Sequence, residues 1–307
     1  MSDAVSRTPY TGRFAPSPTG PLHFGSLLAA TASYLEARRH GGRWLLRIDD
    51  IDPPREAAGA RDEIPRTLEA FGFEWDGPII LQSTHLDRYQ AALEQLLAGG
   101  LAYPCACTRR EVRAVAREGV DGPIYPGTCR NGMPPGREGR AIRLSTHEAQ
   151  IEFKDDYQGP IAVDLEAQMG DFVIRRADGL FAYHLAAAVD DGDGEISHVV
   201  RGIDLLYSAP RQIHLMHCLG LTPPCYAHLP VILNREGQKL SKQTGATGLD
   251  TGQAPALLFH ALRTLGQAIP EPLQGATLEE IWAWALEHWD SEPLQGRDVI
   301  GEVPAVG

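Results

Sequence analysis

The stretch Arg13-Phe14-Ala15-Pro16-Ser17-Pro18-Thr19-Gly20-Pro21-Leu22-His23-Phe24-Gly25-Ser26 decides the fold of this chain. Residues 13–15 predict the end of a strand, the Pro- and Gly-rich run predicts a loop, and apolar residues at helical spacing over about 25–40 predict a helix. Two glycines at 41–42 end that helix, and residues 44–48 then predict a buried strand. A strand, a loop, a helix and a strand make a βαβ unit, so we expect an α/β fold.

The composition of the 307-residue chain is that of a globular protein. Hydrophobic residues make up 43% and charged residues 22%, which excludes disorder as the main state. The net charge of −12 argues against a protein held on nucleic acid by bulk positive charge. No run approaches the roughly 18 apolar residues of a membrane span, and residues 1–10 lack the apolar segment of a secretory signal. Five cysteines do not make a disulfide framework in a chain of this length. We therefore expect a cytoplasmic protein with no membrane partner. We also expect a monomer, although the sequence does not reveal the oligomeric state.

The chain divides into regions of different character. Two more helices are predicted near 61–71 and 87–98, and a region rich in turn residues and cysteines follows at 101–180. Helical and strand patterns resume at 183, which makes 101–180 an inserted, partly β subdomain. The last segment is predicted to be helical, and we expect its Trp282, Trp284 and Trp289 to pack a small helical core.

Two segments carry residues suited to phosphate. At the start of the first helix, unpaired backbone N–H groups and the helix dipole favour an anion. Gly25 leaves room for a ligand there and His23 adds a donor. The alternative is a Pro-rich connection with an ordinary histidine. In the later segment Lys239-Leu240-Ser241-Lys242-Gln243-Thr244-Gly245, two lysines three positions apart can converge on a polyphosphate. The alternative is a solvated turn.

Together these segments resemble the paired signatures of the class I aminoacyl-tRNA synthetases. Residues 13–20 and Arg47-Ile48-Asp49-Asp50-Ile51-Asp52 are similar to the glutamyl and glutaminyl branch, and the resemblance covers most of 13–245. Within that branch the chain most resembles the short members that transfer glutamate to queuosine in the anticodon of tRNA(Asp). It ends soon after Gly245, which leaves no room for a large anticodon-binding region, and it has Ser26 where a second His is usual.

The resemblance implies a Rossmann-type catalytic domain at 1–100 and 181–245, an inserted acceptor-type subdomain with a zinc site at 101–180, and a helical segment at 246–307. It implies ATP-dependent, tRNA-independent activation of glutamate, with Mg²⁺ carried by ATP. The implied catalytic residues are His23 and Lys242, and the implied ATP-binding residues are His23, Gly25, Lys239 and Lys242. The implied glutamate-binding residues are Arg13, Phe14, Ala15, Pro16, Ser17, Asp49, Tyr183 and Arg201.

The implied glutamate pocket is chemically sensible. The guanidinium fork of Arg suits a carboxylate, and Arg201 lies at a predicted strand end, where α/β sheets place ligands. Asp49 stands where the family usually has Glu, so its contact with the substrate ammonium shifts or passes through water. The alternatives are a surface ion pair for Arg201 and core packing for Tyr183.

Three cysteines in the insertion form a candidate metal site. Cys105 and Cys107 are one residue apart, and with Cys129 they can supply part of a tetrahedral zinc site or remain without metal. The resemblance implies Tyr125 as the fourth ligand of one structural Zn²⁺, while His147 and Asp121 are the local alternatives. By contrast, Asp190-Asp191-Gly192-Asp193-Gly194 lacks the spacing of a calcium loop, and we interpret it as a turn.

The insertion also carries a modest basic patch. Between Arg109 and Arg143 there are eight arginines and four acidic residues, which suits RNA or else a solvated charged face. Two other functions stay open. One is a short glutamyl-tRNA synthetase that charges the tRNA 3′ end, and the other is a non-enzymatic RNA-binding paralogue. The same adenylation chemistry also suits transfer to a small non-RNA acceptor.

Overall fold

The computed structural model describes residues 9–233, 248–297 and 299–302. The helices are α1 (Phe24–Arg39), α2 (Ala60–Ala70), α3 (Leu86–Ala98), α4 (Arg109–Val115), α5 (Leu165–Gln168), α6 (Tyr183–Gly192), α7 (Ser208–Leu219), α8 (Ala254–Thr264) and α9 (Leu278–His288). The strands are β1 (Thr11–Phe14), β2 (Arg43–Ile48), β3 (Ile80–Leu81), β4 (Ala102–Cys105), β5 (Glu118–Gly119), β6 (Gly122–Pro123), β7 (Ala141–Leu144), β8 (Gln150–Asp155), β9 (Gly159–Asp164), β10 (Phe172–Arg175), β11 (His198–Gly202), β12 (Cys225–Leu229), β13 (Val231–Leu233) and β14 (Val299–Glu302).

A largely parallel sheet carries the site. One part has the order β1-β2-β3 and the other β11-β12-β8-β9, with the β8–β9 pair antiparallel. The Ser197 N–H donates to the Thr11 carbonyl at 3.0 Å, which joins the start of β11 to the start of β1. The strand order therefore reverses between β1 and β11, and open α/β sheets bind ligands at the carboxyl ends of the strands beside such a point. The predicted α/β fold and its βαβ unit are confirmed.

Helix α1 is the centre of the largest core. The sequence pattern predicts one apolar face, but the helix is buried on nearly every side, because the sheet covers one side and α8 and α9 pack against it as well. A helix enclosed in this way needs no polar face. None of the helices in the described ranges is both long and apolar enough to cross a bilayer.

The C-terminal tryptophans do pack a core, and the structure shows that it is continuous with the main core around α1. Trp282 packs edge-on against Tyr34 and Phe73, each with ring centroids 5.1 Å away, and its indole N–H donates to the Phe71 carbonyl at 2.8 Å. The Trp289 indole donates to Glu36 at 2.9 Å. Short helices bury such large rings best against an existing core.

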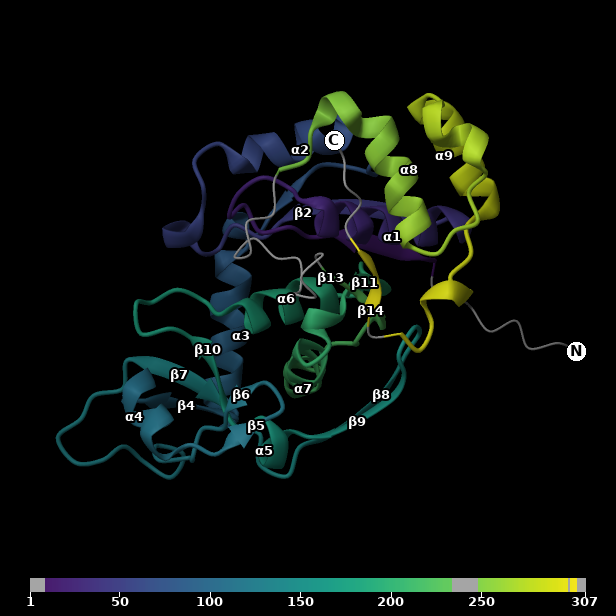
Figure 1. Cartoon of the computed structure of the whole chain (residues 1–307). Coiled ribbons are helices and arrows are strands. Elements are labelled where there is room, and N and C mark those ends of the chain that lie inside the picture. The colour runs from purple at the N-terminus through teal and green to yellow at the C-terminus, as the bar shows by residue number, and fades with distance from the viewer. Residues whose placement is uncertain (1–8, 234–247, 298, 303–307) are drawn as a thin grey trace, which may run out of the picture.

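The insertion forms its own small sheet. Strands β10, β7 and β4 pair antiparallel beside α4, at the end of the molecule opposite to α8 and α9 (Figure 1). The hairpin β8–β9 also lies within the range 101–180, yet β8 pairs with β12, Tyr226 opposite Asp155, and so extends the main sheet. The range 101–180 therefore supplies strands both to the main sheet and to the small sheet of the insertion.

Candidate active site

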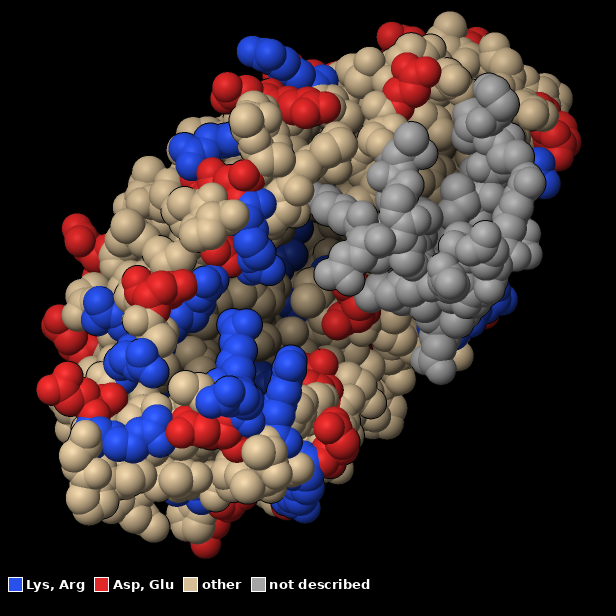
Figure 2. Space-filling view, turned by 60° about the vertical axis from the view of Figure 1, so that its left-hand side comes forward, with Lys and Arg blue, Asp and Glu red and all other residues tan. Residues whose placement is uncertain are grey.

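Two adjoining cavities lie at the carboxyl ends of the central strands. The first cavity, about 600 Å³, is lined by residues that follow β1, begin α1 and end β11. The second cavity, about 830 Å³, lies between the main sheet and the insertion. Ser17, Thr19, Arg55 and Tyr183 line both. Figure 2 shows basic side chains gathered around a hollow on one face of the molecule.

His23 begins α1 as its N-cap. Its Nδ1 accepts from the Ser26 N–H at 3.3 Å, and Ser26 Oγ accepts from the His23 N–H at 3.4 Å, so Ser26 completes a capping box. Because Nδ1 accepts, the proton of the neutral ring is assigned to Nε2, which can donate to a ligand. A Cβ on Gly25 would lie 3.1 Å from the His23 ring, so this glycine leaves room for the imidazole. Both residues line the first cavity.

Arg13 belongs to a buried ionic network that joins three elements. Arg13 on β1 donates through Nε and Nη2 to Asp191 at 3.2 and 3.0 Å, and Arg47 on β2 donates to the same carboxylate at 2.6 Å. The side chain of Asp191 is fully buried. Burial alone would raise the pKa of this carboxyl, but the two guanidinium groups hold the pKa well below its ordinary value. Asp191 therefore stays ionised and holds both arginines in place.

Asp191 corrects the interpretation of residues 190–194 as a turn. Asp190, Asp191 and Gly192 are the last residues of α6, and both acids are buried. Asp190 accepts from Gln82 Nε2 at 2.8 Å and from the Tyr89 hydroxyl at 2.6 Å. The helix continues through the acids because each meets buried donors from distant segments. The sequence did contain a signal for this longer helix, because the two acids directly follow an apolar helical run.

Asp49 lies at the edge of the second cavity. Its Oδ1 accepts from Arg47 Nε at 2.7 Å, which ties it to the Arg13–Asp191 network. Burial raises the pKa of the Asp49 carboxyl to about 6, and the opposing effect of Arg47 and Arg13 is smaller. At neutral pH this carboxylate is mostly ionised, and it is suited to accept a substrate ammonium.

Arg201 is a buried residue at the end of β11, so the alternative of a surface ion pair is excluded. Its Nε donates to His228 Nε2 at 3.0 Å, its Nη1 to Gln212 Oε1 at 2.8 Å, and its Nη2 to the Leu205 carbonyl at 3.2 Å. His228 Nδ1 in turn bonds Asp155. These partners hold the guanidinium rigidly and leave hydrogens on both terminal nitrogens for a ligand. Nothing in the local sequence pointed to them.

The remaining predicted residues are placed as follows. The segment after β1 and the first residue of α6 line the first cavity, and these are Phe14, Ala15, Pro16, Ser17 and Tyr183. Tyr183 is half-buried and not a core residue. Both lysines of the second phosphate segment, Lys239 and Lys242, lie outside the described residues.

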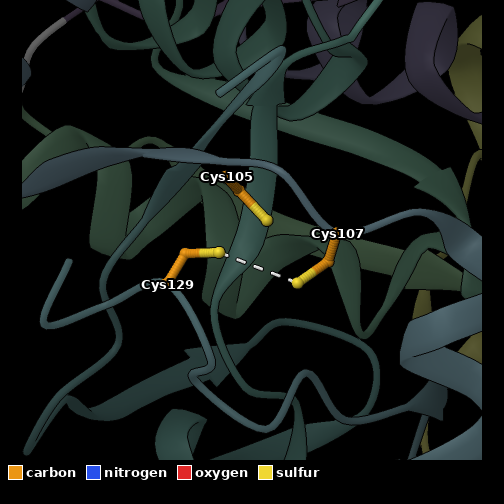
Figure 3. Close-up of side chains that lie close together, drawn as sticks. All are labelled: Cys105, Cys107 and Cys129. Carbon is orange, nitrogen blue, oxygen red and sulfur yellow. Dashed lines mark hydrogen bonds between the residues drawn. The ribbon is translucent and has the colours of Figure 1, made fainter. Parts of the chain in front are cut away.

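The three cysteines of the insertion converge, and their sulfur atoms point toward one another (Figure 3). The Cys107 and Cys129 sulfurs are 3.7 Å apart, and the Tyr125 hydroxyl lies 3.4 Å from the Cys105 sulfur and 3.5 Å from that of Cys107. Around a tetrahedral zinc ion, with bonds of about 2.3 Å to sulfur and about 2.0 Å to oxygen, two sulfurs lie about 3.8 Å apart and sulfur and oxygen about 3.5 Å. The donor set therefore fits zinc.

The two local alternatives for the fourth ligand are engaged elsewhere. His147 bonds Glu166 at 3.1 Å, and Asp121 pairs with Arg211 at 2.5 Å. The structure thus brings Tyr125, and neither of these residues, to the cysteines.

Comparison with known proteins identifies the family. Residues 10–283 match the model described as tRNA synthetases class I (E and Q), catalytic domain. The chain is 55% identical to the Glutamyl-Q tRNA(Asp) synthetase of Dechloromonas aromatica, over 95% of this chain and 98% of that one. The chain belongs to the Glutamyl-Q tRNA(Asp) synthetases of the class I family.

Other members and neighbours agree with this assignment. The Glutamyl-Q tRNA(Asp) synthetase of Chromobacterium violaceum is 54% identical, over 94% of this chain and 95% of that one. A solved glutamate-tRNA synthetase from Elizabethkingia anophelis is 26% identical with a TM-score of 0.79, and the match covers 97% of this chain and 68% of that one. The resemblance drawn from residues 13–20 and 47–52 is confirmed at the level of the family.

Proposed function

We propose that this protein uses ATP to activate glutamate as glutamyl-adenylate, without tRNA, and then transfers the glutamate to queuosine in the anticodon of tRNA(Asp). The observation that carries the proposal is 55% identity over 98% of the length of a relative with that printed name. The geometry of the two adjoining cavities supports it. The protein is also proposed to act as a monomer.

The first cavity suits glutamate. Arg13 is bound to Asp191 through Nε and Nη2, which leaves Nη1 for a substrate carboxylate. Arg201 offers its terminal nitrogens to the other carboxylate. Tyr183 lines both cavities, and Asp49, which lines the second, is proposed to accept the ammonium.

The activation step needs positioning more than proton transfer. An oxygen of the glutamate α-carboxylate attacks the α-phosphorus of ATP, the bond to the bridging oxygen breaks, and pyrophosphate leaves. A carboxylate is already a nucleophile, so no general base is required. The Nε2–H of His23 and the N–H groups at the start of α1 stabilise charge on the phosphates, together with Lys239 and Lys242 and the Mg²⁺ that accompanies ATP.

The transfer step joins the two cavities. A hydroxyl of the queuosine cyclopentenediol attacks the carbonyl carbon of the mixed anhydride. The bond from that carbon to the phosphate oxygen breaks, and AMP leaves with the hydroxyl proton taken up by its phosphate. Ser17 and Tyr183 line both cavities, so glutamate activated in the first faces an acceptor held in the second. Exposed arginines of α4, Arg110 and Arg113, extend this face toward the RNA backbone.

A structural zinc ion is proposed for the insertion. Cys105, Cys107, Cys129 and Tyr125 would hold it, and four protein ligands make a closed site that orders the fold and does no chemistry. Arg143 lies over the Tyr125 ring at 3.8 Å and donates to the Cys105 sulfur at 3.3 Å. This cation offsets the negative charge of the deprotonated ligands.

One experiment tests the function. The protein is mixed with ATP, radiolabelled glutamate and total tRNA, and the label is located by periodate treatment and nuclease mapping. We expect label on an anticodon-loop fragment of tRNA(Asp), and none when queuosine is absent. Label on the 3′-terminal adenosine would instead establish a short glutamyl-tRNA synthetase. No label and no glutamate-dependent pyrophosphate would establish a non-enzymatic RNA-binding paralogue.

A further inference from the structure

The second cavity contains hydrogen-bond acceptors whose donors are missing. Asp52 Oδ1, Glu56 Oε1 and Gln82 Oε1 are buried atoms, and within the described part of the chain they have no hydrogen-bond partner. All three residues line the cavity, and the Gln82 side chain is fully buried. Leaving a buried acceptor unpaired costs about 1–3 kcal/mol, so three in one cavity indicate that a ligand supplies the donors.

The other polar atoms of these side chains are engaged, which fixes where the unpaired oxygens lie. Asp52 Oδ2 accepts from Arg55 Nε at 2.5 Å and from Arg176 Nη1 at 2.9 Å, and Glu56 Oε2 lies 3.6 Å from Arg61 Nη2. Gln82 Nε2 donates to Asp190 Oδ2 at 2.8 Å, so its amide cannot turn over without losing that bond. The acceptors are therefore preorganised before a ligand arrives.

The chemistry of the lining describes the ligand. Carboxylate and amide oxygens accept hydrogen bonds and do not donate them, and two of the three groups carry negative charge. The ligand must then present N–H and O–H groups, and a positive charge among them would face the unpaired oxygens of the two carboxylates. At the same time Arg109 and Arg140 line this cavity and suit phosphate. A nucleotide whose base carries a cationic, hydroxylated side chain matches both the acceptor oxygens and the arginines of this cavity.

Queuosine has such a side chain, because its cyclopentenediol is attached through a secondary amine that is protonated at neutral pH. We propose that Asp52 and Glu56, with Gln82, recognise this ammonium and the ring hydroxyls, and that they select the modified nucleoside over unmodified guanosine. The inference rests on the proposed function and assigns specificity to residues outside the glutamate and ATP pocket.

Two charge-removing variants of nearly unchanged shape test the proposal. In Asp52→Asn and Glu56→Gln, kcat/KM for transfer to tRNA(Asp) that carries queuosine should fall at least about tenfold, as expected for loss of a hydrogen bond to a charged group. Glutamate-dependent ATP–pyrophosphate exchange should stay at the wild-type rate. Glu63→Gln, on the exposed side of α2, is the matched control and should change neither activity.

A small-molecule probe tests the charge directly. The free aminocyclopentenediol should inhibit transfer by the wild type, and cyclopentenediol without the amine should inhibit at least about tenfold more weakly. This difference should shrink in Asp52→Asn and in Glu56→Gln.

The outcomes distinguish failure of the recognition proposal from failure of the proposed function. If the wild type transfers glutamate normally and both variants do so equally well, the recognition proposal is overturned and the proposed function stands. A parallel loss of exchange and transfer in the variants also overturns it, because the residues would then serve folding or activation. Absence of exchange in the wild type, or label on the tRNA 3′ end, refutes the proposed function itself.

Discussion

Replacing Asp191 by asparagine removes the charge that two buried arginines share. The carboxylate accepts two hydrogen bonds from Arg13 and one from Arg47, and the side chain is fully buried. Asparagine keeps the shape, but its amide nitrogen must face a guanidinium group, and the two cations are left with Asp49 as their nearest counter-ion. The effect is that of breaking a buried ion pair.

The magnitude follows from this geometry. Removing one partner of a buried pair costs about 3–5 kcal/mol. For a chain of this length, an unfolding entropy of about 2.1 cal/mol/K per residue converts that cost to a melting temperature lowered by about 5–8 °C. Arg13 also loses the carboxylate that holds its guanidinium group in position. The KM for glutamate in ATP–pyrophosphate exchange should therefore rise at least about tenfold, which corresponds to about 1.4 kcal/mol.

The control variant lies two residues away. Asp193→Asn removes an exposed acid at the end of α6 that pairs with Arg88 at 2.9 Å. An exposed pair contributes at most about 1 kcal/mol, so its melting temperature should change little and its glutamate KM not at all. Thermal unfolding followed by circular dichroism, with exchange assays, measures both variants.

Two results would refute this reasoning. One is a melting temperature for Asp191→Asn equal to that of Asp193→Asn. The other is an unchanged glutamate KM, which would show that Arg13 does not depend on Asp191 for its position. A double-mutant cycle with Arg47→Met adds a check, because that change should cost less when Asp191 is already Asn.

Three further predictions follow from the same structure. Cys129→Ser should lower zinc content, measured by atomic absorption, well below one ion per chain, whereas Cys218→Ser, outside the cluster, should not. Burial raises the pKa of Asp49 to about 6, so protonation removes its charge and the KM for glutamate should rise as pH falls through 6; Asp49→Asn should flatten this profile. Arg110→Ala combined with Arg113→Ala should weaken transfer and reduce its salt dependence by about one logarithmic slope unit for each phosphate that the protein no longer neutralises, with exchange unchanged.

Each of these has a contradicting outcome. Full zinc content in Cys129→Ser would remove that sulfur from the metal site. A glutamate KM that is flat between pH 5 and 7 in the wild type, about one unit either side of the Asp49 pKa, would separate Asp49 from ammonium binding. Equal loss of transfer and exchange in the double arginine variant would exclude a specific RNA face on α4.

Local sequence patterns correctly predicted the first elements of the fold. Apolar periodicity and paired glycines identified β1, α1 and β2 within a residue or two, because these elements depend on neighbours in sequence. The cysteine spacing identified a candidate metal cluster for the same reason. The sequence alone could not choose the fourth ligand of this cluster, since Tyr125, His147 and Asp121 all lie near the cysteines along the chain. Only the folded structure shows which of the three side chains lies beside the sulfurs.

The sequence by itself determined the βαβ unit, the loop-to-helix junction at His23 and the family. Tertiary structure alone decided the electrostatics of the site. Asp191 is 178 residues from Arg13, and His228 reaches both Arg201 and Asp155 only because β11, β12 and β8 are neighbours in the sheet. The unpaired oxygens of the second cavity likewise exist only where the insertion meets the sheet. Side-chain type and spacing specify local conformation, whereas charge pairing and burial depend on which distant segments the fold brings together.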